Sequence, residues 1–446
     1  MVVSNAETRM RNDEVLITVP TRHMFSIRHS SFWFRHSAAA LSFFSLLSFS
    51  AAADWPQFLG PTRNGLADDG EAALPDKFDV EPKLLWQKKL GSGFAGPAVV
   101  DGKVVVFHRI EDEVVIEALN AGSGDALWKF TAPTDYRDSF GMDEGPRATP
   151  TIADGRVFAH GADGMLFALN FKTGKLLWSF DSKAETNSPQ GFFGRACAPL
   201  VVGKNVILTP GGTHMGKPAG VIALDVVTGK IVWQSVADEA SYSSPVKYGD
   251  PSKPRLLCWM RNDLWSLDAA TGQVRHHKRL RSEMDASVNA ATPIPVGEGD
   301  YFLSAGYGVG ASTWALDPDD EPFEGGPLKQ GLFESHYSTP VVSDYHLYGF
   351  NGRQEQGQTL RCIDLHEGKL KWDSTRVPGG TVIIVHDKLV CVTEQGELWI
   401  VKASPEKFEQ LHVAQILRAG HRSYPALSDG VLFARDGEKI VAIKLR

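Results

Sequence analysis

"ALNFKTGKLLWSF", residues 168–180, is a stretch that the chain repeats with small changes. An earlier copy reads "ALNAGSGDALWKF" at 118–130, and a later one reads "ALDVVTGKIVWQS" at 223–235. The turn glycines of these three copies are 50 and 55 residues apart. A period of this size is the signature of a repeat architecture, in which each unit is one supersecondary structure. The structure of a single unit therefore decides the fold.

A second motif runs in step with the first and shows how often the unit recurs. It joins two short apolar runs through a turn that often contains Asp-Gly, as in "TPTIADGRVFAH" at 149–160. Each copy precedes a copy of the first motif or a degenerate form of it. We find eight copies, at 96–107, 149–160, 198–208, 244–259, 292–304, 339–350, 380–392 and 424–435.

Each unit has the pattern of four short antiparallel strands. In "KLLWSF", for example, Leu176, Trp178 and Phe180 fall on one face and the intervening residues on the other. The Thr-Gly pair that precedes them suits a type I turn followed by a left-handed residue, where glycine is favoured. Eight such units of about 45 residues predict an all-β fold, an eight-bladed β-propeller with four-stranded antiparallel blades.

The two ends of the repeat region predict how the ring closes. The last unit stops at "KIVAIKLR", 439–446, which is a third strand with no fourth. A spare strand with the expected tryptophan, "KLLWQKKL" at 83–90, precedes the first complete unit. Pairing these two segments would complete one blade from both ends of the chain and leave no unpaired edge there.

The N-terminal region has the features of an export signal. The apolar segment 38–53 ends in small residues, with Ala51 and Ala53 in the positions that signal peptidases favour. A membrane-spanning helix needs about 20 residues, so this segment is short for a stable span. We therefore expect 1–53 to be a signal peptide, with Met24 favoured as the natural start. The protein would be periplasmic or secreted, with an N-terminal extension, 54–82, packing on the propeller, 83–446.

The first motif also carries a family resemblance. The pattern A-L-D-x-x-T-G-x-x-x-W resembles the repeat of the PQQ-dependent quinoprotein dehydrogenases, and it is equally similar to that of BamB, a non-enzymatic propeller of the outer-membrane β-barrel assembly machinery. The stretch "DWPQFLGPTRNG", 54–65, resembles the start of mature chains in a group of exported bacterial PQQ-like proteins. The resemblance implies that the repeated tryptophan docks neighbouring blades. The tryptophans concerned are Trp86, Trp128, Trp178, Trp233 and Trp372.

Two functions follow from this resemblance. Quinoprotein alcohol dehydrogenases hold PQQ with calcium at the propeller centre, over a tryptophan and under a disulfide between adjacent cysteines. This chain has four cysteines, far apart in the sequence, and none is adjacent to another. We therefore favour a binding or scaffolding module for a protein, peptide or glycan ligand, with no assured cofactor and no metal site. The alternative is a periplasmic PQQ-dependent oxidoreductase of the alcohol or sugar dehydrogenase type.

Polar residues just before the innermost strands are the candidate ligand-binding residues. These loops gather at one end of a propeller, where they form a funnel. Their side chains could hold an anionic or sugar-like ligand, or they could serve only to satisfy backbone groups in a solvated opening. The candidates are Arg147, Arg195, Asn289, His336 and His421.

Other ligand classes are disfavoured. The formal net charge of −7, with no marked basic run, argues against a nucleic-acid partner. "GGTHMGK", 211–217, has the spacing of a phosphate-binding loop. However, Pro218 replaces the Ser or Thr that would hold magnesium, and a strand rather than a helix follows. "GYGVG" at 306–310 also lacks a following helix, so both stretches are interpreted as hairpin loops and no nucleotide site is expected.

Overall fold

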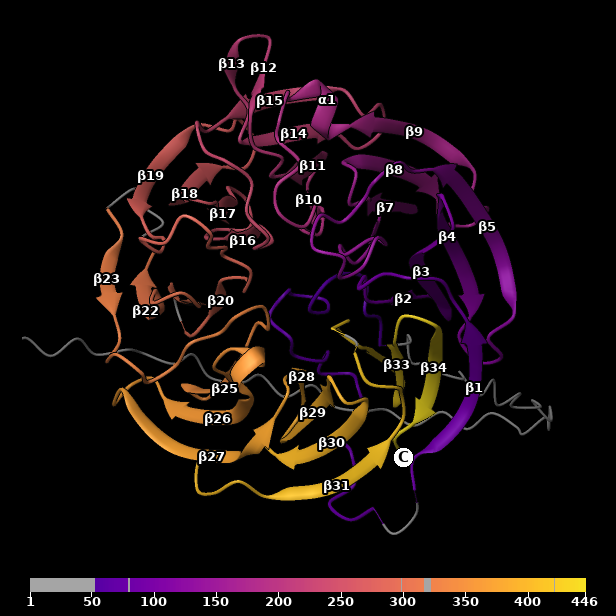
Figure 1. Ribbon diagram of the computed structural model, residues 1–446, viewed down its shortest axis with the longest axis vertical. Coiled ribbons are helices and arrows are strands. Elements are labelled where there is room, and N and C mark those ends of the chain that lie inside the picture. The colour runs from indigo at the N-terminus through magenta and orange to yellow at the C-terminus, as the bar shows by residue number, and fades with distance from the viewer. Residues whose placement is uncertain (1–52, 79–80, 298, 317–321, 421) are drawn as a thin grey trace, which may run out of the picture. The chain divides into compact units, whose positions relative to one another are not determined.

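The predicted β-propeller is the architecture of this chain. The computed structural model describes residues 53–446 except 79–80, 298, 317–321 and 421, and the predicted signal peptide lies outside this part apart from its last residue. Within the described residues, eight four-stranded antiparallel sheets stand around a central axis (Figure 1). We number these blades from β2 onward, and within each blade the innermost strand comes first.

The first four blades follow one another along the chain. Blade 1 comprises β2 (Ala98–Val100), β3 (Lys103–Ile110), β4 (Glu113–Asn120) and β5 (Ala126–Pro133). Blade 2 comprises β6 (Thr151–Ala153), β7 (Arg156–His160), β8 (Met165–Asn170) and β9 (Leu176–Asp181). Blade 3 comprises β10 (Leu200–Val202), β11 (Asn205–Leu208), β14 (Val221–Asp225) and β15 (Ile231–Ser235). Blade 4 comprises β16 (Val246–Tyr248), β17 (Arg255–Trp259), β18 (Asp263–Asp268) and β19 (Val274–Arg279).

The next three blades repeat this order. Blade 5 comprises β20 (Ile294–Pro295), β21 (Asp300–Ala305), β22 (Gly310–Ala315) and β23 (Glu324–Pro327). Blade 6 comprises β24 (Val341–Ser343), β25 (His346–Asn351), β26 (Gln358–Asp364) and β27 (Lys369–Val377). Blade 7 comprises β28 (Gly380–Val385), β29 (Lys388–Thr393), β30 (Glu397–Lys402) and β31 (Gln410–Gln415). The additional elements are α1 (Ser182–Glu185), η1 (Gln354–Gln356), and a hairpin of β12 (Thr213–His214) and β13 (Lys217–Pro218).

Blade 8 closes the ring as predicted. It contains β32 (Ala426–Ser428), β33 (Val431–Arg435), β34 (Lys439–Lys444) and, as its outermost strand, β1 (Lys83–Lys89). β1 pairs antiparallel with β34, and the register runs from Lys83 opposite Lys444 to Lys89 opposite Lys439. In Figure 1 the indigo β1 lies beside the yellow β34. Both ends of the repeat region are therefore held in a single sheet, which leaves no unpaired blade edge at the seam.

The turn between the third and fourth strands explains why the motif keeps its glycine. Gly174 has φ of +69°, in the left-handed region. A Cβ built on it would lie 2.5 Å from the indole of Trp128 in the preceding blade. The side chain of Asn170 accepts hydrogen bonds from the backbone N–H groups of Lys172 and Thr173, which shapes the turn. A larger residue at the glycine would therefore strain the backbone and push the blades apart.

The five predicted tryptophans all contact the neighbouring blade. Each indole N–H donates to a carbonyl in the turn after the third strand of the next blade, and we propose that these contacts dock the blades. Trp86, Trp128, Trp178, Trp233 and Trp372 donate to the carbonyls of Ala121, Phe171, Val226, Ala269 and Ser404, respectively. Three of them, Trp86, Trp233 and Trp372, are buried, whereas the other two are partly exposed.

Residues 54–71 contact the innermost strands of several blades, and we call them the N-terminal plug. Trp55 exchanges two backbone hydrogen bonds of 2.8 Å with Val99 of β2. Further along, the Gly65 carbonyl accepts from the N–H of Ile384 in β28, at 2.8 Å. The plug thus contacts the innermost strands of blades 1 and 7, and Figure 1 shows this indigo segment near the centre of the ring. Leu59 is fully buried there.

Arg63 holds the plug to blades 3 and 4. Its guanidinium donates to the carbonyls of Ala198 and Pro199, at 3.1 and 2.6 Å, and to that of Pro245, at 2.7 Å. These residues lie immediately before β10 and β16. Burial lowers the pKa of Arg63 to about 9, which leaves the side chain protonated at neutral pH. A single charged side chain therefore replaces solvent for three buried backbone acceptors.

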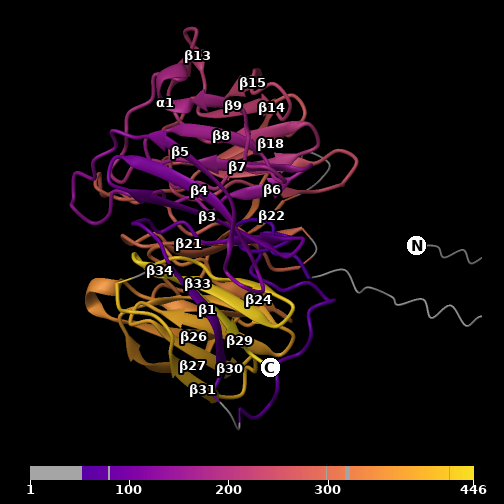
Figure 2. The same ribbon diagram turned by 90° about the vertical axis from the view of Figure 1, so that its right-hand side faces the viewer.

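The strand order decides which loops meet at which end. Since neighbouring strands are antiparallel, the turns after the first and third strands of each blade lie at one end of the ring. The loops after the second and fourth strands lie at the other, which we call the loop end. Figure 2 shows the blades from the side. Side chains that come from very different places in the sequence can therefore meet at the loop end.

Candidate functional site

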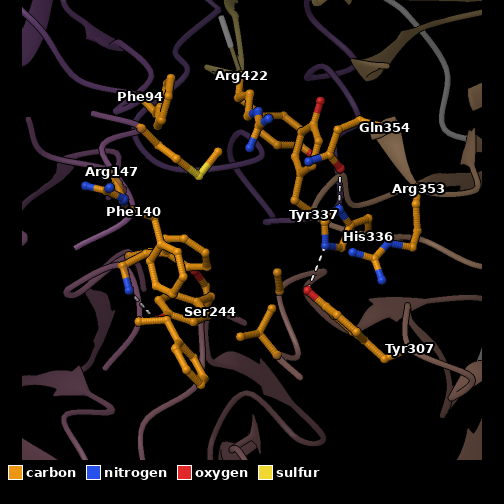
Figure 3. Close-up of a pocket in the computed structure, with 18 of the residues that line it drawn as sticks. Phe94, Phe140, Arg147, Ser244, Tyr307, His336, Tyr337, Arg353, Gln354 and Arg422 are labelled. Atoms are coloured by element: carbon orange, nitrogen blue, oxygen red, sulfur yellow. Dashed lines mark hydrogen bonds between the residues drawn. The ribbon is translucent and has the colours of Figure 1, made fainter. Parts of the chain in front are cut away.

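The loop end carries a pocket of about 430 Å³, which we call the cup (Figure 3). Its floor includes Phe58 of the N-terminal plug, whose ring meets that of Tyr424 edge-on, with 5.0 Å between the centroids. Because Phe58 belongs to the N-terminal plug, the plug forms part of the cup's lining. Its other lining residues include Phe94, Phe140, Met142, Arg147, Phe192, Phe193, Tyr242, Ala286, Val288, Tyr307, His336, Tyr337, Arg353, Gln354, Glu355 and Arg422.

One wall of the cup is apolar. Phe140, from the β5–β6 loop, packs against Phe193, from the β9–β10 loop, with ring centroids 5.1 Å apart. Phe192, Met142 and Val288 extend this surface. Phe140 remains 59% exposed although it belongs to a cluster of aromatic rings. Exposed apolar surface gathered in a concave site is typical of a place where a ligand or partner binds.

The opposite wall is cationic and polar, and it includes Arg422. Its Nε donates to Oε1 of Glu394 at 3.0 Å, and the hydroxyl of Tyr337 donates to the same oxygen at 2.5 Å. The guanidinium stands 5.1 Å from the centre of the Tyr337 ring and 6.0 Å from that of Phe94. The carboxylate and the two rings therefore hold the guanidinium in one orientation.

A series of three hydrogen-bonded side chains lies beside it. Tyr307 donates its hydroxyl proton to Nε2 of His336 at 2.9 Å, and Nδ1 of His336 donates to Oε1 of Gln354. With its proton on Nδ1, a neutral imidazole can accept at Nε2 from the Tyr307 hydroxyl. Burial lowers the pKa of His336, which favours the same neutral state. The series therefore keeps its hydrogen bonds unchanged at neutral pH.

Tyr307 is held in an unusual backbone conformation. Its φ is +62°, which a bulky residue rarely adopts. The guanidinium of Arg353 lies 4.6 Å from the centre of its ring and also pairs with Glu355 at 3.1 Å. Burial raises the pKa of the Tyr307 phenol, so the hydroxyl remains a proton donor. Backbone strain of this kind persists where the surrounding structure enforces it, often at functional sites.

Of the predicted funnel residues, Arg147 and His336 line the cup. His336 lies in the hydrogen-bonded series described above. Arg147 uses its Nη atoms on its own loop, where it donates to the carbonyls of Asp143 and Gly145 and to the carboxylate of Asp138. Its guanidinium also stands over the ring of Phe94, at 5.9 Å. Arg147 therefore shapes the wall more than it offers free donors.

Arg195 and Asn289 do not line the cup. Arg195 is buried and donates to Ser188 and to the carbonyls of Pro189 and Gln190, which holds the loop before β10. The side-chain amide of Asn289 donates to the carbonyl of Met260 at 2.8 Å. Both side chains satisfy backbone groups, as the alternative to ligand binding in the sequence analysis describes. The fifth candidate, His421, lies outside the described residues.

Sequence reasoning missed several residues of the cup. Arg422 and Tyr337 stand next to His421 and His336 in the loops before the innermost strands, so their signal was present in the sequence. Tyr307 comes instead from the β21–β22 loop, and Arg353 from the β25–β26 loop. Loops after the second strand also reach the loop end, and this follows from the antiparallel order once four strands per unit are predicted.

The cup does not offer the donor set that the quinoprotein resemblance implies for PQQ with calcium. Among its described lining residues the one carboxylate is Glu355, and it is already paired with Arg353. No tryptophan is among those lining residues. Across the described part of the sequence, no group of three or more His, Cys, Asp or Glu side chains is placed to hold a metal ion. The four cysteines, Cys197, Cys258, Cys362 and Cys391, are buried free thiols.

The known proteins that resemble this chain include dehydrogenases and outer-membrane assembly factors. The quinohemoprotein alcohol dehydrogenase ADH-IIG of Pseudomonas putida is 31% identical over 175 residues, which are 38% of this chain and 22% of that protein. The outer membrane protein assembly factor BamB of Moranella endobia is 25% identical over 263 residues, 56% of this chain and 62% of that protein. The chain thus spans less than two thirds of either relative.

Solved structures show the same fold at low sequence identity. BamB from Moraxella catarrhalis superposes with a TM-score of 0.57 at 13% identity, covering 82% of this chain and 98% of that one. A europium-containing methanol dehydrogenase gives a TM-score of 0.65 at 13% identity, covering 88% and 89%. At such identities the likeness establishes the propeller and no function.

Two further findings bear on the class of protein. No helix in the described ranges has the length and apolar character needed to cross a membrane. A family model described as outer membrane protein assembly factor BamB matches residues 78–253 and 215–407, which together cover most of the propeller. The chain therefore belongs to this family of PQQ-like repeat β-propellers.

Proposed function

We propose that this chain is an exported binding module, in which a rigid propeller presents the cup to part of a protein, peptide or glycan ligand. The observation that carries this proposal is the cup, with one mainly apolar aromatic wall and one cationic wall. A volume of about 430 Å³ is in the range of pockets that enclose a small molecule or a few side chains. Export is supported by the signal-like segment 38–53.

The way the walls are built supports binding. The cup is made of loops, and two of them are held by buried bonds, those of Arg195 to Ser188 and of Asn289 to Met260. Phe58 is held from below by the N-terminal plug, which contacts several innermost strands. Side chains held in this way lose little conformational freedom when a ligand arrives, so less of the interaction energy is lost to ordering.

A PQQ-dependent oxidoreductase of the alcohol or sugar dehydrogenase type is the alternative. The curated dehydrogenase relatives support it, and they make PQQ with calcium the first cofactor to test. The cup does not favour it, because the donor set implied for calcium is not assembled among its described residues. We therefore propose binding as the function and treat cofactor binding as an outcome to be measured.

The experiment uses 8-anilinonaphthalene-1-sulfonate, an anionic aromatic fluorophore whose chemistry suits both walls. We expect saturable binding of one molecule to the purified mature protein, followed by fluorescence. Ala286→Trp adds a large ring at an exposed position of the cup lining and should abolish this binding. Met215→Trp is the matched control, because Met215 is 88% exposed at the tip of the β12–β13 hairpin and does not line the cup.

Equal fluorophore binding by both variants would refute the cup as the ligand site. A separate titration with PQQ and calcium, followed by quinone absorbance, tests the alternative. Binding at micromolar or lower concentrations that is lost in Ala286→Trp would favour the dehydrogenase function over the binding module. We expect no tight binding of the quinone.

A further inference from the structure

The two walls of the cup differ in chemistry and in origin. The apolar wall comes from loops before blades 2, 3 and 5, and includes Phe140, Phe193 and Val288. The polar wall comes from later loops and includes Tyr307, Tyr337 and Arg422. Figure 3 shows Phe140 across the cup from His336, Tyr337 and Arg422. Arg147 lies beside Phe140, but its side chain is 9% exposed and its Nη atoms bond its own loop. A ligand that fills the cup therefore meets a mainly apolar surface at one end and a cationic one at the other.

Arg422 stands out among the arginines of the cup because its terminal nitrogens are free. Nε is used on Glu394, but neither Nη1 nor Nη2 has a hydrogen-bond partner among the described residues. The side chain is 25% exposed, so the free nitrogens can still meet a ligand. Arg147 uses both Nη atoms within its own loop, and Arg353 uses Nε and Nη2 on Glu355.

Two parallel N–H donors on a fixed planar group match the two oxygens of a carboxylate. Glu394 holds the guanidinium from behind through Nε, so Nη1 and Nη2 remain for an end-on pair. A phosphate would bring more oxygens and charge than these two N–H groups can satisfy. Of the other two arginines of the cup, Arg147 bonds its own loop and Arg353 is paired with Glu355. A ligand without an acceptor group would leave the two Nη donors of Arg422 unpaired in a partly buried site.

The opposite wall specifies the rest of the ligand. Phe140, Phe192, Phe193 and Val288 offer no hydrogen-bonding side-chain groups, so a ligand rich in hydroxyls would lose its contacts with water there without replacement. An apolar or aromatic body would instead bury surface against these side chains. The ligand chemistry that satisfies both walls is therefore a carboxylate attached to an apolar body.

We propose that the cup binds a carboxylate joined to an apolar group, with the two Nη atoms of Arg422 as its anchor; this inference rests on the proposed function of the cup as a ligand site. Two sources present this chemistry, a free organic acid and the C-terminal carboxylate of a polypeptide that ends in an apolar residue. Glu394 and Tyr337 act as positioning residues, because they orient the guanidinium and do not themselves contact the carboxylate.

The test compares an acid with its uncharged analogue. The probes are 3-phenylpropanoate and 3-phenylpropanamide, together with a short peptide ending in Phe with a free or an amidated C-terminus, titrated calorimetrically into the mature protein. We expect each carboxylate form to bind about 10- to 100-fold more tightly than its amide, the range of a charge-assisted pair. The source is a free acid if only phenylpropanoate shows this difference, and a polypeptide terminus if the peptide binds more tightly.

Arg422→Gln removes the anchor and should reduce acid binding to the level of the amide while leaving amide binding unchanged. Arg422→Lys keeps the positive charge but not the two parallel N–H donors. We expect this variant to retain only part of the preference for the acid over the amide. Arg279→Gln is the matched control, because Arg279 is largely exposed on the outer strand β19 and should change neither affinity. Thermal melting of each variant checks that the fold is kept.

The possible failures are distinguishable. If acid and amide bind equally, or if an oligosaccharide of glucuronate binds more tightly than either, the inference is refuted and the cup remains a ligand site. If the anilinonaphthalene probe binds in the cup but the phenylpropyl probes do not, the inference is also refuted. If no probe binds, the proposed function fails together with it. If Arg422→Gln lowers the melting temperature, the inference is judged instead from the ratio of the acid and amide affinities. This ratio should be high in the wild-type protein and lower in Arg422→Lys, and an unchanged ratio would refute the inference.

Discussion

Replacing Arg63 by alanine tests whether the N-terminal plug contributes to the stability of the ring. Arg63 is 3% exposed and donates to three carbonyls in the segments before β10 and β16. These segments belong to blades 3 and 4, which are far from Arg63 in the sequence. Arg63→Ala removes all three donors at once and shortens a side chain that packs in the channel.

The expected loss can be worked from these contacts. The Pro199 carbonyl keeps a second donor, the Thr151 hydroxyl at 2.6 Å, so Arg63→Ala leaves two carbonyls without a donor. A buried acceptor left without a donor costs about 1–3 kcal/mol, so these two would cost up to about 6 kcal/mol if they stayed dry. Two effects reduce this sum. Water can enter the space that the side chain leaves, and burial of the charge, which lowers the pKa of Arg63 to about 9, no longer opposes folding. We expect the free energy of unfolding to fall by about 3 kcal/mol.

The assay is urea unfolding of the mature protein, followed by tryptophan fluorescence, with limited proteolysis to detect release of residues 54–71. Arg279→Ala is the matched control, since its guanidinium is mostly exposed and its removal should change stability by less than about 0.5 kcal/mol. A loss under about 1 kcal/mol for Arg63→Ala, with the plug still protected from protease, would refute the idea that this arginine holds the plug in place.

Three further predictions concern the blades, pH and export. Trp233→Ala should cost about 3–5 kcal/mol of unfolding free energy, because Trp233 is buried against the turn of the next blade; a loss under about 1 kcal/mol would mean that the contact does not dock the blades. Burial lowers the pKa of His160 to about 4 in the folded protein, whereas the same side chain titrates near pH 6.5 in the unfolded chain. Between about pH 6.5 and pH 4, the imidazole is therefore protonated in the unfolded chain but neutral in the folded protein. Stability should therefore fall by about 3 kcal/mol from this residue between those pH values, and His160→Gln should show a shallower decline in acid unfolding curves. N-terminal sequencing of the exported protein should begin at Asp54, and an intact segment 38–53 on that protein would contradict cleavage.

The blade architecture was open to prediction because its determinants are local and repeated. A turn glycine with positive φ, alternating apolar residues and a tryptophan at a constant offset all act within about 45 residues. One copy of this pattern predicts the fold only weakly, but eight copies at a similar spacing predict it strongly. Ring closure followed from the same pattern, because a spare strand at 83–90 matched a missing strand after 439–446. No long-range information was needed for either step.

The tertiary structure decided which of the loop residues face the cup and where the plug lies. Arg195 and Arg422 both lie in loops before innermost strands, but one bonds its own loop and the other presents two free nitrogens to the cup. That difference depends on loop backbones with no periodicity. The plug is the clearest case, since "DWPQFLGPTRNG" has no strand pattern, and Arg63 finds its acceptors more than 130 residues away. The binding site of Arg63 forms only when the ring closes, because its acceptor carbonyls come from two separate blades.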